Sequence, residues 1–374
     1  MRTKAVHGAT SASHPLVSFR WVMRAIFANI TLALLCAYVV AQEPAPFVVP
    51  VFQLQKHTVK LKSSEFSRYQ KWILSQHPSP AKGALLTSTI TSTYFPFTPT
   101  ITWYKAKIST ANFETLLKDT YPYCSAILET VEGNYDYSPD GAFWVDFANA
   151  SHFGGGFRSR GNVQEERMFD EFPQLPDLAY ELNGKKSILP VNSSGEAEPF
   201  LVVQLLRKFD VSNVPYGKKL DDTSPTAVQQ AVIRLTAPFK MAHIIGLAAK
   251  DYSNMKGAKY SMADLKYHLQ AAYLGDLAAC QYNGTTAPII HTGRWGAGAF
   301  KNSLKMLTAL QILAAEMAFP SATNPGYLFF HGIDNSIIDP IQEEILLALQ
   351  AGKTPSQLLT TYYNRQKTDA SWRP

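Results

Sequence analysis

The sequence is poor in cysteine, with three among its 374 residues. Cys36 lies in an apolar run near the N-terminus, which leaves Cys124 and Cys280 for the rest of the chain. Two cysteines are too few for a zinc site, and no metal site is predicted. They allow one disulfide in an oxidising compartment. The sequence leaves open whether they form it or remain two separate buried thiols.

A large excess of one charge is also lacking. The whole chain has 35 basic and 29 acidic residues, a net charge of +6. Residues 1–41 hold four of the basic residues and no acid, so the rest of the chain has 31 basic and 29 acidic residues, a net charge of +2. A surface that binds DNA or RNA needs a strong basic excess. The charge balance therefore predicts no nucleic-acid binding.

Only one long apolar run is present, at residues 25–40 (AIFANITLALLCAYVV). It follows a basic segment and is followed by Ala41 and Gln42, where cleavage by a signal peptidase is expected. This layout predicts a secretory signal peptide over residues 1–41 and a secreted or secretory-pathway location. The alternative is an uncleaved anchor, but the run is shorter than the ~20 residues that a membrane-spanning helix needs. No later stretch resembles a membrane span, so no membrane contact is expected after cleavage.

Residues 42–133 are predicted to form an extended lead-in and a mostly helical accessory region. Residues 42–62 hold three prolines and show no helical period. Apolar residues at helical spacing follow at 63–75 and 109–131, and Pro122 is expected to end or kink the second helix.

Residues 134–374 show strand-like segments that alternate with helix-like segments. Strands are predicted at 143–148, 199–206, 231–235 and 327–330, and helices at 261–277, 303–319 and 354–366. Such alternation is typical of α/β proteins. We therefore expect an α/β fold.

A glycine triplet at 154–156 follows the first of these strands, which ends near Asp146 and Asn149. Ligands of α/β proteins bind at the carboxyl ends of strands, and glycines let a phosphate or sugar approach the backbone. Seven residues after the triplet comes the sequence QEE, with Glu165 and Glu166. If a helix begins there, its dipole stabilises both carboxylates. Adjacent helix positions point about 100° apart, so the two glutamates can have different roles.

A second glycine-rich segment, residues 291–300 (HTGRWGAGAF), lies between the apolar residues 287–290 and the helix predicted at 303–319. A strand, a glycine loop and a helix N-terminus can bind a phosphate through backbone N–H groups. The segment lacks the GK[ST] ending of a P-loop, and its spacing differs from the dinucleotide fingerprint. Alone it does not identify a ligand.

Together the two segments resemble the signature of the poly(ADP-ribose) glycohydrolases, which are macrodomain enzymes. The resemblance extends to VDFAN at 145–149, TGRWGAGAF at 292–300 and TPSQLLTTYYNRQ at 354–366. It implies a macrodomain-like mixed sheet flanked by helices over residues 134–374. The implied reaction is hydrolysis of the ribose–ribose glycosidic bonds of poly(ADP-ribose), with no cofactor. ADP-ribose or its polymer would be the substrate, and we expect a monomer.

By this resemblance Glu166 is the catalytic acid, which protonates the leaving hydroxyl and then activates water. Glu165 would hold ribose hydroxyls, while Asp146 and Asn149 would orient the distal ribose and the acid. The other implied substrate-binding residues are Gln164, the two glycine loops and one aromatic residue, namely Gly154, Gly155, Gly156, Gly293, Arg294, Trp295, Gly296, Ala297, Gly298, Ala299, Phe300 and Phe329.

The sequence departs from the family pattern in the second glycine loop and in the aromatic positions. Arg294 and Ala297 stand where the family commonly has asparagine and cysteine. For the aromatic residue that stacks on the substrate, Phe329, Phe330 and His331 compete, and Phe329 is the prediction. For the tyrosine that covers the substrate in the family, the sequence offers only Phe209 and Tyr216 and does not choose between them. Two alternatives follow, a macrodomain that binds ADP-ribose without cleaving it and a hydrolase of mono-ADP-ribose or related extracellular nucleotides.

Asn192 and Asn283 lie in acceptor sequences for N-glycosylation, which suit a secreted protein. Asn149 lies in a third acceptor sequence. We expect Asn149 to stay unmodified, because it should be folded against the glycine loop of the substrate site.

Overall fold

The computed structural model describes residues 52–60, 68, 71–72, 74–75, 79–89, 100–122, 126–153, 161–182, 188–255, 257–319 and 325–374. The predicted leader, most of the predicted helix at 63–75, Cys124 and the glycine triplet 154–156 lie outside these residues. The domain boundary between residues 133 and 134 stays a prediction.

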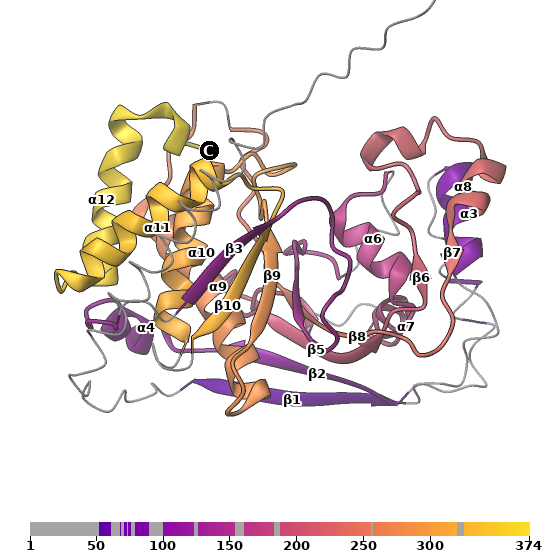
Figure 1. The fold of residues 1–374 in the computed structure, drawn as a ribbon, viewed down its shortest axis with the longest axis horizontal. Helices are drawn as coiled ribbons and strands as arrows, with labels where there is room; N and C mark the ends of the chain where they lie inside the picture. The colour runs from indigo at the N-terminus through magenta and orange to yellow at the C-terminus, as the bar shows by residue number, and fades with distance from the viewer. Residues whose placement is uncertain are drawn as a thin grey trace, which may run out of the picture. The chain divides into compact units, whose positions relative to one another are not determined.

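Eight strands form one mixed sheet in the order β1-β2-β5-β8-β4-β9-β10-β3 (Figure 1). Five neighbours run parallel, namely β8 (Met241–Gly246), β4 (Phe143–Asp146), β9 (Ile289–Gly293), β10 (Gly326–His331) and β3 (Ala126–Val131). The remaining three are antiparallel to their neighbours, namely β5 (Phe200–Leu206), β2 (Thr100–Lys107) and β1 (Gln53–Lys60). The expected α/β fold with a mixed sheet is confirmed.

Helices cover both faces of this sheet. Figure 1 shows α9, α10, α11 and α12 on one side, and α6, α7, α8 and α3 on the other. The first group is α9 (Met262–Asn283), α10 (Leu304–Ala318), α11 (Asn335–Gln350) and α12 (Pro355–Thr368). The second is α6 (Gln164–Glu171), α7 (Gln174–Glu181), α8 (Pro225–Ala231) and α3 (Pro80–Thr89). Shorter elements are α4 (Thr110–Leu116), η4 (Gly217–Leu220) and η5 (Ala370–Trp372).

The central strand β4 is buried on both faces, which explains its nearly continuous apolar sequence. Phe143 and Val145 belong to the core cluster built with α9 and α10, whereas Trp144 belongs to the cluster that contains Met168 of α6. Successive side chains of a strand point to opposite faces. Asp146, the last residue of β4, therefore points to the same face as Trp144, toward α6.

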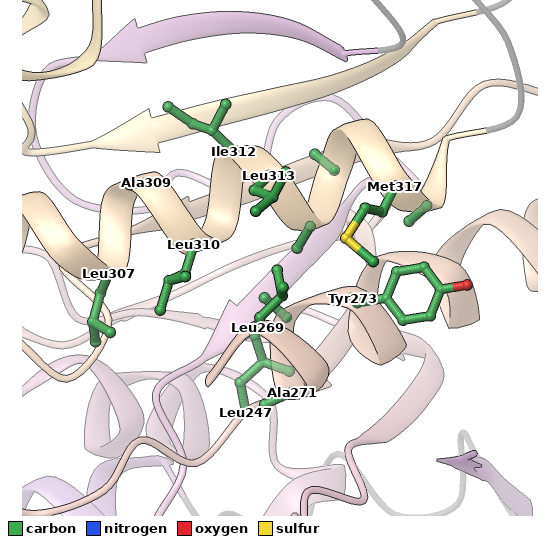
Figure 2. Close-up of a cluster of buried hydrophobic side chains, with 14 of the residues drawn as sticks. Leu247, Leu269, Ala271, Tyr273, Leu307, Ala309, Leu310, Ile312, Leu313 and Met317 are labelled. Atoms are coloured by element: carbon green, nitrogen blue, oxygen red, sulfur yellow. The ribbon is translucent and has the colours of Figure 1, made fainter. Parts of the chain in front are cut away.

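The larger core cluster lies between α9, α10 and the sheet. In Figure 2, Leu269 and Tyr273 of α9 lie across from Leu310, Leu313 and Met317 of α10. Both helices begin at the serine that the sequence indicates. Each of these serines accepts a hydrogen bond from the backbone of the first helical turn.

The predicted helix at 109–131 is wrong beyond its first part. Helix α4 ends at Leu116, and residues 126–131 form β3, parallel to β10. The run Ala126-Ile127-Leu128 fits a strand as well as a helix, so periodicity alone did not separate the two. The sheet also takes β1 and β2 from the region expected to be mostly helical. In β2 every second side chain is buried, starting with Ile101 and Trp103. The next buried position is Lys105, which pairs with Glu198, so the apolar alternation expected of a strand is interrupted in the sequence.

The strand predicted at 231–235 is reduced to β7 (Ile233–Arg234), because Ala231 ends helix α8. Strand β7 pairs with β6 (Phe209–Asp210) in a separate two-stranded sheet, and the Ile233 side chain is exposed. Helix α11 was not predicted, because Pro340 interrupts its apolar pattern. Among the helices of the described residues, none has an apolar stretch that could cross a membrane.

Candidate active site

Gln164 joins the start of α6 to the end of β4. Its side-chain N–H donates to the carbonyl of Val145 (2.8 Å), and its side-chain oxygen accepts the N–H of Phe147 (3.0 Å). Both backbone partners flank Asp146, so one amide side chain fixes the first turn of α6 beside this carboxyl. The predicted helix start at residues 163–164 is confirmed.

Glu165 and Glu166 both lie in the first turn of α6 and are buried, at 9% and 6% exposed. The residue before the helix is Val163, which has no side chain that can cap it. Glu166 Oε2 instead accepts the N–H of Val163 at 3.1 Å. The predicted placement of both glutamates at a helix N-terminus is correct.

Asp146 is a buried carboxyl with no hydrogen-bond partner for either oxygen among the residues of known placement. Burial, and to a smaller extent the negative charge of Glu166, raise its pKa to about 8. Buried carboxyls normally have partners, so an unsatisfied one at the end of a central strand indicates a ligand site. The Asp146 carboxyl therefore lies within reach of the Glu166 charge at the edge of the sheet.

The last residue of β9, Gly293, and two residues of the β9–α10 loop, Trp295 and Gly296, serve the fold. A Cβ on Gly293 would lie 2.7 Å from the carbonyl oxygen of His331, and one on Gly296 would lie 2.5 Å from Cβ of Ala249. Gly296 also has a φ of +65°, which favours glycine. The Trp295 indole is buried and donates to the carbonyl of Leu247 (3.2 Å). Its side chain therefore does not reach a substrate.

The second half of this loop is free to meet a ligand. A Cβ on Gly298 would touch nothing within 4 Å. Within the described part of the chain, no group accepts the N–H of Gly298, Ala299 or Phe300. The N–H of Ala297, in contrast, donates to the backbone carbonyl of Arg294 (3.0 Å). Successive unused N–H groups before a helix suit an anion such as a diphosphate.

Substitution by alanine should affect stability differently at Gly296 and at Gly298. Gly296→Ala introduces a clash with Ala249 and a strained φ, and we expect a loss of roughly 2–4 kcal/mol in the free energy of unfolding. Gly298→Ala meets open space and should change stability by less than about 0.5 kcal/mol. If the backbone at Gly298 binds phosphate, the dissociation constant for ADP-ribose should rise about tenfold. Denaturation and calorimetry measure both, and unchanged binding by Gly298→Ala would remove the loop from the site.

A cavity of about 160 Å³ opens beside these elements. It is lined by three predicted site residues, Gln164, Gly293 and Arg294. The rest of the lining is mainly aromatic or charged and includes Tyr135, Tyr137, Phe147, Arg167, Glu171, Tyr216 and His331. Aromatic walls with a few polar groups are typical of a site for a nucleoside.

Tyr216 and Arg167 form one wall of this cavity. The Arg167 guanidinium lies 4.9 Å from the centre of the Tyr216 ring and donates to the carbonyl of Val214 (2.6 Å). The Tyr216 side chain is 48% exposed, although a large aromatic side chain is usually covered. The exposed ring is therefore available to a flat ligand.

A family model described as Poly (ADP-ribose) glycohydrolase (PARG), Macro domain fold, matches residues 116–321, more than half of the chain. The chain belongs to this family. It is accordingly a hydrolase of the PARG type, and its sheet is the macrodomain sheet of that family. The resemblance found in the sequence is confirmed.

Solved PARG structures resemble the chain at low sequence identity. The enzyme from Thermomonospora curvata bound to the inhibitor ADP-HPD shares 13% identity and a TM-score of 0.40, over 76% of this chain and 98% of that one. The enzyme from Deinococcus radiodurans in complex with ADP-ribose shares 11% identity and a TM-score of 0.40, over 78% and 95%. No curated protein matches the chain. The family assignment rests on the family model.

For the aromatic position of the PARG signature, the structure brings His331 and not Phe329 to the cavity. Phe329 is not among the residues that line the cavity and stacks on His291 (4.9 Å between ring centres), and Phe330 is fully buried in the larger core cluster. His331 is hydrogen bonded to His291 through a ring nitrogen pair at 2.9 Å, and His291 stacks on Trp144 at 3.7 Å. We therefore replace Phe329 by His331 as the stacking candidate.

Asn149 of the PARG signature is half-buried, and its side-chain oxygen accepts the N–H of Ser151 (2.8 Å). The turn follows β4 closely, and the glycine triplet comes later in the sequence, outside the described residues. The bond occupies the oxygen only, so the Asn149 amide N–H groups can still reach a substrate.

Cys280, Asn192 and Asn283 are not among the residues that line the cavity. Cys280 is a free thiol whose Sγ lies 3.7 Å from the carbonyl oxygen of Ala318. The side-chain N–H groups of Asn192 donate to Glu196, and those of Asn283 donate to the carbonyls of Thr286 and Ala287. Glycosylation of either asparagine stays a prediction.

Proposed function

We propose that this chain is a secreted glycohydrolase that cleaves ribose–ribose bonds of poly(ADP-ribose) with a glutamate acid/base. The carrying observation is the buried Asp146 carboxyl, without a hydrogen-bond partner among the described residues, beside two buried glutamates at a helix N-terminus. A protein that only binds ADP-ribose does not need three carboxyl groups together. A glycosidase needs a proton donor and negative charge near a cationic transition state.

In the proposed reaction Glu166 gives its proton to the leaving ribose oxygen as the bond from the anomeric carbon breaks. The anomeric carbon gains positive charge, which the neighbouring carboxylates stabilise. A water molecule then gives a proton back to Glu166 and its hydroxide to that carbon. Glu165 holds the hydroxyls of the same ribose, and Asp146 orients the sugar and the acid.

The rest of the substrate fits the other walls. The diphosphate binds the unused N–H groups of Gly298, Ala299 and Phe300 in the loop that precedes α10. The adenosine end enters the cavity between Tyr216 and His331, where aromatic stacking favours a flat base. Arg294, at the cavity rim, provides a positive charge for a phosphate.

Incubation of the purified protein with poly(ADP-ribose) tests this function. We expect free ADP-ribose as the product, detected by chromatography. A mono-ADP-ribosylated protein serves as a second substrate in parallel. Release from the second substrate only would favour the mono-ADP-ribose hydrolase, and tight polymer binding without release would favour the non-catalytic macrodomain.

Export is tested by expressing the full chain in eukaryotic cells. We expect protein in the medium whose N-terminal residue is Gln42. Asn149 should carry no glycan, because it follows β4 in the proposed site and its oxygen already accepts a hydrogen bond. Peptide mass spectrometry measures occupancy at Asn149, with Asn192 as the matched control. A fully occupied Asn149 is incompatible with the proposed site.

A further inference from the structure

Helix α6 is both charged and buried. All residues from Glu165 to Glu171 are buried, and five of these seven side chains are ionisable. Buried charges need partners, because leaving water without a compensating interaction is strongly unfavourable. The partners of α6 therefore determine how the helix presents Glu165 and Glu166 to the site.

Asp170 on α6 pairs with a lysine from the N-terminal part of the chain. Lys82 Nζ lies 3.2 Å from Asp170 Oδ2, and the two side chains are 0% and 1% exposed. Lys82 lies on α3, which packs against α6. The next residue, Glu171, uses a different cation, Arg207, at 2.7 Å. The Lys82–Asp170 pair is thus a separate, fully buried attachment between α3 and α6.

Asp170 lies one helical turn after Glu166, so the two side chains lie on the same side of α6. Burial raises the pKa of Asp170, the Lys82 ammonium lowers it, and the Glu166 charge raises it. The other ionisable groups that act on Asp170, Glu166 or Asp146 are Arg167 on α6, Tyr135 and Tyr216. The Lys82 and Asp170 charges therefore belong to the same set of buried charges as Glu166 and Asp146.

We propose that Lys82 is a positioning residue for the hydrolysis, which acts through Asp170 to hold α6 in place and to balance a buried charge one turn from Glu166. This inference rests on the proposed function. Without Lys82, the negative charge of Asp170 is uncompensated, and the alkaline limb of the activity moves to higher pH. Without the Asp170 carboxylate, the Lys82 charge is uncompensated, and the alkaline limb of the activity moves to lower pH.

The test compares the wild type with Lys82→Met, Asp170→Asn, the double variant and Lys82→Arg. The pH profile of ADP-ribose release from the polymer is measured for each, together with the pH profile of ADP-ribose affinity. We expect the alkaline limb to move up by about 0.5–1 pH unit in Lys82→Met and down by a similar amount in Asp170→Asn. In the double variant and in Lys82→Arg the alkaline limb should return toward its wild-type position. In Lys82→Met and in Asp170→Asn, kcat should also fall about tenfold.

Lys105→Met is the matched control, because Lys105 is also a buried lysine of the N-terminal part and pairs with Glu198 (3.3 Å) away from α6. It should lower the unfolding temperature and leave the alkaline limb in place. An alkaline limb that stays at its wild-type pH in both Lys82→Met and Asp170→Asn would overturn the inference. It would show that the Lys82–Asp170 pair only stabilises the fold. If Lys82→Met does not fold, the alkaline limb of Asp170→Asn is compared with that of the double variant, and the same outcomes apply. A wild type without polymer hydrolysis would instead contradict the proposed function, and the affinity profiles would still test the role of Lys82.

Discussion

Glu166→Gln is expected to lower kcat for poly(ADP-ribose) hydrolysis by about 10³-fold, since a general acid contributes 10²–10⁴-fold. Glutamine cannot donate an acidic proton to the leaving oxygen. It can still accept the N–H of Val163, which Glu166 Oε2 accepts in the present structure. The cap of α6 is therefore kept, and the dissociation constant for ADP-ribose should change by less than about threefold. Steady-state kinetics and calorimetry measure the two quantities.

Glu165→Gln is the matched control for this variant. It is the neighbouring carboxylate in the same helical turn and has nearly the same burial. If Glu165 holds ribose hydroxyls, its loss should raise KM more than it lowers kcat. Equal losses of kcat in both variants would mean that the two glutamates do not have the separate roles assigned to them. Activity that survives Glu166→Gln would contradict Glu166 as the acid.

Asp146→Asn is expected to make the protein more stable at alkaline pH and less active. The pKa of Asp146 in the folded protein is raised to about 8 from an ordinary value of 3.8. Below about pH 4 the carboxyl is protonated in both the folded and unfolded states, and it does not affect stability. Between pH 4 and 8 it ionises only on unfolding, so the free energy of unfolding falls as pH rises.

Relative to the wild type, Asp146→Asn should therefore gain roughly 2–5 kcal/mol in the free energy of unfolding between pH 4 and pH 8. Its kcat should fall by about 10²-fold, because the sugar and the acid lose a carboxyl that orients them. Urea denaturation at pH 4, 6 and 8 measures the first effect. A stability difference that does not change with pH would show that Asp146 ionises normally in the folded protein.

Much of the site was predictable because its residues are close together in the sequence. The strand that ends at Asp146, the helix start at Gln164 and the two glutamates fall within twenty-four residues, so local patterns were sufficient. The capping role of Glu166 follows from its position in the first turn. The serine caps of α9 and α10 were likewise predictable from local sequence.

Other parts of the site depend on contacts between distant residues. His331 lines the cavity because β10 lies beside β9 and ends there, whereas alternation along a strand does not say which residue is the last. Arg167 directly follows the glutamate pair and was visible in the sequence, but its contact with Tyr216 spans 49 residues and a loop of irregular structure. Lys82 is an ordinary lysine in the sequence, and only the packing of α3 on α6 shows that it is buried.

The central claim is that the start of α6 and the β9–α10 loop form two walls of one ADP-ribose site. A crystal structure of Glu166→Gln with ADP-ribose tests it most directly. We expect the diphosphate within hydrogen-bond distance of the N–H groups of Gly298, Ala299 and Phe300, and the distal ribose against Glu165 and residue 166. ADP-ribose bound elsewhere, or bound here with its distal ribose away from the start of α6, would contradict the account.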